Sequence, residues 1–510
     1  MSRFLPLTAL LAAFSLSALA QDDVFFPSAS YEPSIPTPES VLGYRVGENF
    51  TPYHQLERYY QQLAAASERV QLDPYGESVE GRTLYLVIIT APENHSRLDA
   101  IRDASARLSD PRATSQEEAE RLAASTPVVV WLSYNVHGNE SVSSEAALQV
   151  AYELAASGEA RVADWLAQAV VVLDPIVNPD GRERYVHYYR STVGRRPNPD
   201  RFAAEHQERW PGGRTNHYLF DLNRDWVWQT QPESRARVRA FLRWHPQVHV
   251  DYHEMRASST YFFPPPAEPV HETFRALLAK WYGIYGRANA AAFDRHGFRY
   301  YTGEDYDLLY PAYGDTWPAL NGAVGMTYEQ AGGGFAGLVV ELPQGERRLT
   351  LHDRAARHFL TSLSTLQASV EHRTERLRDY YEFRRAAIEA GRNGSVRQFF
   401  LVPGADRERL ARAVEILQRQ GIEVQRAEAA FEAEKLTDFR GETLARQQLP
   451  AGTYVVDLAQ PQGFLARAVL EREAALASTF FYDVTAWSLP LAFGLETYAA
   501  AEPAQVALTR

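Results

Sequence analysis

The chain has 510 residues, 45% of them hydrophobic, so it can bury a sizeable core and has the length of two folded units. Its 64 acidic residues outnumber its 52 basic residues, and the formal net charge of −12 argues against a general nucleic-acid-binding protein. The sequence contains no cysteine, which excludes disulfides, thiolate metal ligands, thiol catalysis and lipid attachment through a cysteine.

Residues 1–20 are typical of an export signal. Arg3 supplies a positive charge, residues 4–16 form an apolar stretch, and residues 18–20 (Ala-Leu-Ala) match a small-x-small cleavage site. The apolar stretch is short for a membrane span, and no later run reaches ~18 residues. We therefore expect an exported protein, periplasmic or secreted, that has no membrane span and begins near Gln21.

The segments before residue 128 show strand and helix patterns in turn. Residues 21–46 are rich in proline and serine and predict an extended lead-in on the surface. We then expect, in chain order, a helix over 52–67, strands around 70–72 and 83–90, and a charged helix over 101–124.

A buried strand that ends in a polar turn follows this region. The β-branched and aromatic run over 128–131 predicts the strand, and a helix is expected over 144–156. His137 and Glu140 lie in the turn between them. An imidazole and a carboxylate at the mouth of a strand can bind one zinc ion at ~2.0–2.2 Å, and a third protein ligand leaves one position open for water. The turn therefore predicts a catalytic zinc site.

The spacing His-x-x-Glu is a weak pattern by itself. It recurs at His54 and Glu57 and at His372 and Glu375. Both of these pairs lie in segments that read as charged or amphipathic helix, where such a pair is most simply two residues on a solvated face. The zinc prediction for His137 therefore depends on further parts of a site downstream.

The middle of the chain predicts more buried strands. We expect them over residues 169–177, 249–253 and 325–329, and His249, Asp251 and His253 then share one face. The first ends in Asn178-Pro179-Asp180-Gly181, a turn sequence, and residues 190–216 predict a long loop over a site. Strands that alternate with helices favour an α/β fold with a mixed sheet, whose ligands bind beyond the carboxyl ends of the strands.

A second, smaller unit is predicted at the end of the chain. A charged helical segment over 354–390 is expected to close the first domain, and the composition changes near 391–394. We then expect a strand over 397–402, a helix over 406–420, strands over 422–427 and 453–458, and a helix over 463–473. The unit has no histidine and no glycine-rich phosphate loop, so we expect a supporting or docking module without chemistry of its own.

Several short motifs carry polar groups at positions where a site would need them. In chain order they are HGNE with His137 and Glu140, NPDG, RTN with Arg214, DLNRDW with Asp221, Asn223 and Arg224, DYH with His253, YPAYG with Tyr310, and TYE with Glu329. Alone, a buried histidine is usually a core residue and a glutamate at a strand end is usually a cap. Together and in this order, across roughly residues 50–370, the motifs resemble the zinc carboxypeptidase family, the carboxypeptidase A-like metallopeptidases.

The resemblance implies a three-layer α/β/α sandwich around a mixed, mostly parallel sheet, followed by a smaller C-terminal α/β domain, as in a bacterial-type member. The catalytic domain would cover residues 47–372, a helical or linker segment 373–395, and the small domain 396–510. This last part vaguely resembles the glutamine-amidotransferase-like domains appended to some bacterial members. Without a cysteine it would be a degenerate copy of such a domain.

The resemblance also implies one zinc ion per chain, with His137, Glu140 and His253 as its ligands. Asp221 would be the carboxylate behind His137 that orients its imidazole toward the metal. Glu329 would be the general base, which takes a proton from the zinc-activated water and passes it to the leaving amine.

The remaining roles concern the substrate. Arg214 would polarise the scissile carbonyl, with Arg190 as the alternative arginine. Asn223 and Arg224 would bind the terminal carboxylate of the substrate, because a guanidinium suits a planar carboxylate. Tyr310 would close over the bound residue. An Asn-Arg pair of this kind favours a carboxypeptidase over an aminopeptidase.

The expected substrate is a peptide or protein with a free C-terminus. Asn139 stands where the pancreatic carboxypeptidases of this family carry an arginine. The loop before Arg214 is long for the family. Two alternatives remain at this point: a peptidase of the same family that trims peptidoglycan stem peptides, and a non-catalytic zinc-containing binding protein. The preferred terminal residue and the oligomeric state stay open.

Overall fold

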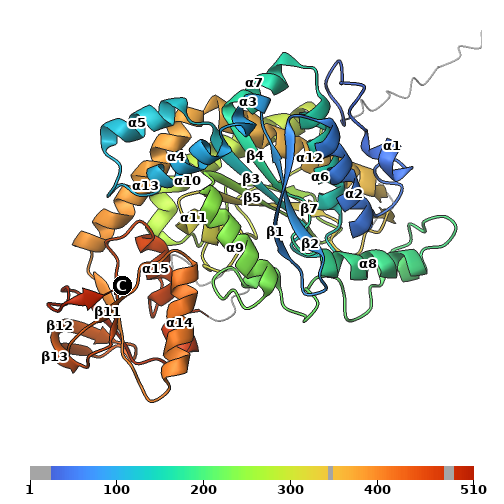
Figure 1. The fold of residues 1–510 in the computed structure, drawn as a ribbon. Coiled ribbons are helices and arrows are strands. Elements are labelled where there is room, and N and C mark those ends of the chain that lie inside the picture. The colour runs from blue at the N-terminus through green and yellow to red at the C-terminus, as the bar shows by residue number, and fades with distance from the viewer. Residues whose placement is uncertain (1–23, 343–347, 476–486, 510) are drawn as a thin grey trace, which may run out of the picture.

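The structure is a computed structural model that describes residues 24–342, 348–475 and 487–509 (Figure 1). The export signal predicted over residues 1–20 lies outside the described residues. Among the residues that are described, no helix is both long enough and apolar enough to cross a membrane.

The first of two large sheets carries the predicted site strands. Within the described residues it has seven strands, in the order β1-β2-β4-β3-β5-β7-β6. The central strands β4, β3, β5 and β7 run parallel to one another, and β1, β2 and β6 pair antiparallel at the edges. The strands are β1 (Val70–Glu77), β2 (Thr83–Ile89), β3 (Val128–Tyr134), β4 (Ala169–Asp174), β5 (Val248–Met255), β6 (Tyr261–Phe262) and β7 (Val324–Ala331). The mixed sheet confirms the expected fold class.

Helices cover both faces of this sheet. Side chains that point to opposite faces of β3 contact different helices. Trp131 packs against Phe241 of α9 (Pro232–Trp244), with ring centroids 5.8 Å apart. Tyr134 points to the opposite face, where its hydroxyl lies 2.8 Å from that of Ser362 in α12 (Leu351–Glu371). The sheet is therefore the middle of three layers. We call this sheet and its helices the N-terminal domain.

The other helices connect or cover these strands. They are α1 (Pro38–Leu42), α2 (Tyr53–Ala66), α3 (Pro92–His95), α4 (Leu98–Leu108), α5 (Gln116–Ser125), α6 (Val142–Ala156), α7 (Ala160–Gln168), α8 (Pro179–Thr192), α10 (Glu272–Arg295), α11 (Thr316–Leu320) and α13 (Arg373–Asn393), with short 3-10 turns η1 (Ala204–His206) and η2 (Leu222–Arg224). Two short strands, β8 (Val339–Glu341) and β9 (Arg348–Thr350), pair antiparallel with each other.

Two expectations about local structure are corrected. The segment from Asn178 to Gly181 is the start of α8 rather than a turn: the side chain of Asn178 accepts a hydrogen bond from the backbone N–H of Gly181 at 2.9 Å, and Pro179 occupies the first helical position. Asparagine and proline favour a helix start as much as a turn, so the dipeptide alone does not distinguish them. The long helices expected over 101–124 and 354–390 are each two helices, α4 with α5 and α12 with α13.

The described part of the C-terminal unit forms a second sheet of seven strands, all paired antiparallel. Its order is β13-β12-β15-β10-β14-β11-β16, with strands β10 (Gln398–Leu401), β11 (Gln425–Ala427), β12 (Phe431–Asp438), β13 (Thr443–Leu449), β14 (Tyr454–Asp457), β15 (Thr497–Ala500) and β16 (Leu508–Thr509). Its helices are α14 (Arg407–Arg419), α15 (Gly463–Leu470) and α16 (Leu489–Ala492). The sequence did not predict the hairpin of β12 and β13, whose outward face is charged and exposed.

The two domains pack against each other through α13 and α11 (Figure 1). Phe383 of α13 contacts Phe464 of α15 edge-to-face, with ring centroids 5.3 Å apart. Trp317 of α11 is fully buried, and its indole N–H donates a hydrogen bond of 3.0 Å to Gln420. The C-terminal domain therefore rests on the helix that follows the predicted YPAYG motif.

A buried ion pair ties the segment just before α2 to two of the helices that follow the site strands. Arg182 of α8 donates a hydrogen bond of 2.5 Å to Glu145 of α6, and both side chains are essentially inaccessible to water. Glu145 also accepts hydrogen bonds from the backbone N–H and the hydroxyl of Thr51, at 2.7 and 2.8 Å. Each charge is thus compensated by a network that links three segments distant in sequence.

Removing one member of this pair should destabilise the fold strongly. Arg182→Ala leaves Glu145 buried without its counter-charge, which costs about 3–5 kcal/mol in the free energy of unfolding. The matched control is Arg385→Ala, which removes a solvent-exposed arginine paired with Glu382 and should cost about 1 kcal/mol or less. Chemical denaturation of both variants measures the difference. Equal losses would contradict a structural role for the buried pair.

Candidate metal centre and catalytic cleft

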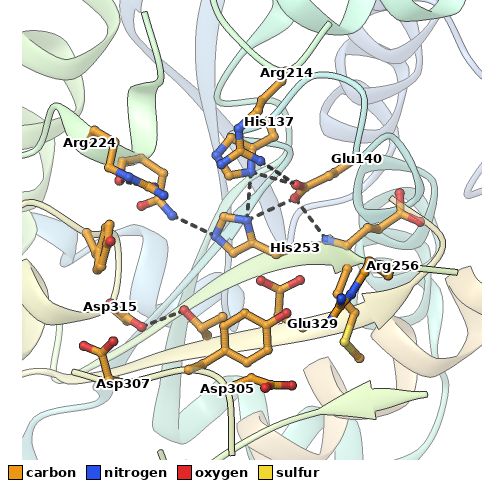
Figure 2. Close-up of a pocket in the computed structure, with 16 residues that line it drawn as sticks. His137, Glu140, Arg214, Arg224, His253, Arg256, Asp305, Asp307, Asp315 and Glu329 are labelled. Carbon is orange, nitrogen blue, oxygen red and sulfur yellow. Dashed lines mark hydrogen bonds and ion pairs between the residues drawn. The ribbon is translucent and has the colours of Figure 1, made fainter. Parts of the chain in front are cut away.

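The predicted ligands meet at the carboxyl ends of the parallel strands. His137 and Glu140 lie in the turn after β3, and His253 lies near the end of β5. Glu329, on β7, is the register partner of His253 across the sheet. Parallel strands place these ends on one edge, so residues far apart in the sequence share one cleft (Figure 2).

Three side chains form a compact group of donors. Nδ1 of His137 lies 2.8 Å from Oε1 of Glu140, and Nδ1 of His253 lies 3.0 Å from Oε2 of the same carboxylate. The two Nδ1 atoms are 3.2 Å apart, and one ligand atom from each residue can be chosen so that all lie within 4.8 Å of one another. Two imidazole nitrogens and a carboxylate oxygen are a donor set that zinc accepts, so these residues fit the metal.

The electrostatics of Glu140 agree with a cationic centre. Burial by itself raises the pKa of this carboxyl. The neighbouring imidazoles of His137 and His253 lower it by more than burial raises it, so the net pKa lies well below the ordinary value. Glu140 is therefore held as a carboxylate, the form that binds metals. A hydrogen bond of 3.0 Å from the backbone N–H of Glu254 also fixes its Oε2.

Asp221 lies behind His137, as the resemblance implied. Its Oδ1 is 3.0 Å from Nε2 of His137, on the side of the ring away from Glu140. Although burial acts to raise the pKa of Asp221, the imidazole of His137 lowers it well below the ordinary value, with help from Arg214 and Arg224. An ionised carboxylate at Nε2 holds the proton there and leaves Nδ1 free for a metal.

The structure brings Arg214 to the cleft and leaves Arg190 outside it. Arg214 donates hydrogen bonds to Asp221 from Nε and from one terminal nitrogen, and its other terminal nitrogen lies 3.4 Å from Oε1 of Glu140. Arg190 sits on α8 and donates a hydrogen bond of 3.4 Å to the backbone carbonyl of Phe50. Of the two arginines that the sequence left open, Arg214 is the one beside the metal group.

The loop that follows α8 and carries Arg214 contacts the metal-binding turn. Asn139, in the metal-binding turn, donates a hydrogen bond of 2.8 Å to Glu208 of this loop. The other oxygen of Glu208 accepts the backbone N–H of Gly213 at 2.6 Å. Asn139 therefore anchors the segment that carries Arg214.

Glu329 lies below the metal group in the same cleft (Figure 2). Its Oε2 is buried and has no hydrogen-bond partner within the described part of the chain. Burial raises the pKa of Glu329 well above the ordinary value, against the opposing effect of His253. A carboxyl group with a raised pKa and a free oxygen is suited to exchange protons with a reacting molecule.

Asn223 and Arg224 form one side of the cleft. Arg224 stacks on the ring of Tyr313, with its guanidinium carbon 4.5 Å from the ring centroid. Asn223 accepts a hydrogen bond of 2.7 Å from the backbone N–H of Gly314 through Oδ1, and its amide nitrogen lies 3.3 Å from Nε2 of His253. Both side chains are thus held in place at the rim of the metal centre.

The structure does not bring Tyr310 into the cleft as predicted. Tyr310 is 1% exposed, and its hydroxyl accepts a hydrogen bond of 3.1 Å from the indole N–H of Trp228. Tyr306 and Tyr313 line the cleft instead. The segment from Tyr306 to Tyr313 contains three tyrosines, and the sequence does not distinguish which of them faces inward.

Several lining residues were not predicted from the sequence. The cleft has a volume of about 630 Å³, and its wall opposite the metal group carries acidic side chains (Figure 2). The residues beyond the predicted set are Glu254, Met255, Arg256, Asp305, Tyr306, Asp307, Tyr313, Asp315 and Thr327. Asp315 accepts hydrogen bonds from Thr316 and Thr327, and burial raises its pKa to about 6. No sequence pattern identified these residues individually as lining a cleft.

Comparisons with known proteins found one matching family profile and several similar solved structures. The profile of the zinc carboxypeptidase family matches residues 56–280. Among solved structures, the chain is similar to a metallo-carboxypeptidase from Burkholderia cenocepacia, with 17% identity and a TM-score of 0.42 over 63% of this chain and 69% of that chain. It is also similar to the carboxypeptidase A from Helicoverpa armigera, with 16% identity and a TM-score of 0.40 over 67% and 79%.

A third similar structure is a metallo-carboxypeptidase from Pseudomonas aeruginosa in complex with (2-guanidinoethylmercapto)succinic acid, with 17% identity and a TM-score of 0.41 over 63% of this chain and 70% of that chain. No curated protein sequence matches the chain. The family profile covers His137, Glu140, Asp221 and His253, the residues that the structure gathers around one point. The N-terminal domain therefore matches the profile of the zinc carboxypeptidase family, a family of zinc-dependent peptidases, over residues 56–280.

Proposed function

We propose that the protein is an exported zinc carboxypeptidase that removes C-terminal residues from peptides or proteins. One observation carries the proposal: the three metal donors, a buried carboxyl, an arginine beside the donors and an Asn-Arg pair all line one cleft. Export rests on the sequence of residues 1–20 alone.

Zinc bound by His137, Glu140 and His253 supplies Lewis-acid chemistry and lowers the pKa of water to ~7. Glu329 is the group placed to take a proton from the attacking water, since it lies in the cleft beside the donors with an unpaired buried oxygen. The same carboxyl can return that proton to the leaving amine, because burial raises its pKa and makes the protonated form more accessible than in an exposed glutamate.

Arg214 is the cation that stabilises negative charge on the carbonyl oxygen of the scissile bond. One of its terminal nitrogens lies 3.4 Å from Oε1 of Glu140, so a carbonyl oxygen bound beside the three donors would be within reach of the guanidinium. Asp221 fixes that guanidinium by accepting hydrogen bonds from two of its nitrogens, which reduces the reorganisation needed during the reaction.

Asn223 and Arg224 supply the recognition of a chain end. A guanidinium beside an amide suits the two oxygens of a terminal carboxylate, whereas a free amino terminus would require an acidic group at this position. The stacking of Arg224 on Tyr313 holds the guanidinium plane in one orientation. The geometry therefore favours the C-terminus of a substrate as the end that is bound.

A catalytic role is supported over a purely binding role by Glu329. A protein that only bound zinc and peptide would have no use for a carboxyl whose buried oxygen has no partner among the described residues, because such an oxygen destabilises the fold. Its retention next to a complete set of metal donors is expected of an enzyme.

The base assignment predicts a specific loss. Glu329→Gln should lower kcat by about 10²–10⁴-fold, because the amide cannot accept the proton, while the zinc content stays at one ion per chain. The matched control is Glu304→Gln, an exposed glutamate outside the cleft, which should keep wild-type kinetics. Steady-state kinetics with metal analysis of each sample measures both quantities. Wild-type kcat in the Glu329 variant would remove this residue from the mechanism.

The recognition assignment predicts a loss that depends on the substrate. Arg224→Ala should lower kcat/KM for peptides with a free C-terminus by about 10²-fold or more, because the carboxylate loses its charged partner. The same peptides with an amidated C-terminus should already be poor substrates of the wild-type enzyme and should change little in the variant. If wild-type protein cleaved free and amidated peptides equally well, terminal recognition by Arg224 would be wrong.

A further inference from the structure

A second aspartate lies behind the other metal-binding histidine. Oδ2 of Asp251 is 3.1 Å from Nε2 of His253, on the side of the ring away from Glu140. Asp251 precedes His253 by two positions on β5, so both side chains point to the same face of the sheet. Asp221 holds the equivalent position at His137, at 3.0 Å from its Nε2.

The carboxylate of Asp251 is buried without hydrogen bonds. The residue is 1% exposed, and neither of its oxygens receives an aligned hydrogen bond from any residue that the structure describes. An unpaired buried carboxylate is costly, and the ring of His253 is within ion-pairing distance. A small rotation of the ring would direct its Nε2–H to this oxygen.

The surroundings leave space for this carboxylate. A Cβ atom at position 314 would lie 2.0 Å from Oδ2 of Asp251, so only the glycine found there admits the group. The same point lies 3.1 Å from the indole nitrogen of Trp226, which is itself buried without an acceptor. The loop that carries Gly314 thus closes over Asp251 without displacing it from His253.

The protonation pattern of His253 identifies the acceptor that it needs. Nδ1 faces His137 and Glu140 and must be unprotonated to bind a metal, so Nε2 carries the proton. The amide nitrogen of Asn223 is also near Nε2, but the amide oxygen is engaged by Gly314, which leaves the NH2 group on the side of the ring. An NH2 group cannot accept a hydrogen bond from the Nε2–H group. The carboxylate of Asp251 is the neighbour that can.

We propose that Asp251 is a positioning residue of the metal centre. Its carboxylate accepts the Nε2–H of His253, fixes the tautomer and the ring orientation, and so presents Nδ1 to zinc. The inference rests on the proposed function only in that His253 is a zinc ligand. Each histidine ligand is then backed by a carboxylate of its own. Asp221 comes from a loop and is shared with Arg214, whereas Asp251 comes from the same strand as its histidine.

The difference between the two aspartates gives the test its controls. Asp251→Asn should weaken zinc binding about 10–100-fold, measured as a dissociation constant by competition with a chromophoric chelator. Asp221→Asn is the reference variant at the other histidine. Asp174→Asn is the matched control: Asp174 is a buried aspartate at the end of β4, which β3 separates from β5. It accepts a hydrogen bond from Tyr75, and in the described part of the chain it is paired with no ligand imidazole. Zinc affinity should not change in that variant.

A spectroscopic readout separates positioning from a general loss of structure. Cobalt(II) bound in place of zinc should show an altered visible absorption spectrum in Asp251→Asn and an unaltered one in Asp174→Asn. In the zinc-loaded wild-type protein, the Nε2 protons of His137 and His253 should both exchange slowly with water by NMR. This second measurement needs no variant, and rapid exchange of the His253 proton would overturn the inference.

The outcomes also separate this inference from the proposed function. If wild-type protein binds one zinc ion and Asp251→Asn binds it equally well with the same cobalt spectrum, the positioning role is wrong and the function stands. If zinc binding weakens in the variant but the wild-type protein cleaves no peptide, the positioning role stands and the function is wrong. If the wild-type protein binds no zinc, both are wrong.

Discussion

The site depends on the parallel register of β3, β5 and β7. Because these strands run in the same direction, their carboxyl ends lie on one edge, and His253 is paired directly with Glu329 across the sheet. The turn after β3 then has only to bring His137 and Glu140 to the same edge. A sheet of buried, tightly hydrogen-bonded strands is rigid, so the donors are held in place before a metal or a substrate arrives.

Loops supply the groups that tune these donors. Asp221 contacts Nε2 of His137, accepts hydrogen bonds from Arg214 and receives the backbone N–H of Asn223. One carboxylate therefore couples a metal ligand, the proposed oxyanion cation and the proposed carboxylate-binding segment. The C-terminal domain contributes indirectly. Its Gln420 accepts a hydrogen bond from Trp317, which follows the loop of Gly314 and Asp315. Packing between the domains thus supports the wall of the cleft.

The sequence predicts the parts of the site that lie in motifs and not those set by contacts between loops. His137, Glu140, His253 and Glu329 come together as expected, because each follows a strand with a clear buried pattern or lies near the end of one. Asp221 joins them from the loop that carries the DLNRDW motif. Tyr310 does not, since three nearby tyrosines have the same local signal and tertiary packing selects which are buried. The period-two pattern places Asp251 on the face of His253, but its contact depends on Gly314, which comes from a distant loop. The β12–β13 hairpin was not predicted because its strands are largely exposed and charged. The boundaries of the domains and the resemblance of residues 396–510 to an amidotransferase-like domain remain predictions.

The most direct test of the central claim is the mass of the products that the purified protein makes from a peptide with a free C-terminus. The zinc-loaded protein should remove residues one at a time from that end, and a chelator should abolish the reaction until zinc is restored. Cleavage inside the peptide, trimming from the amino end, or unchanged cleavage after removal of the metal would contradict the account. Cleavage confined to peptidoglycan stem peptides would favour the related cell-wall peptidase, and one bound zinc ion without any cleavage would favour a binding protein.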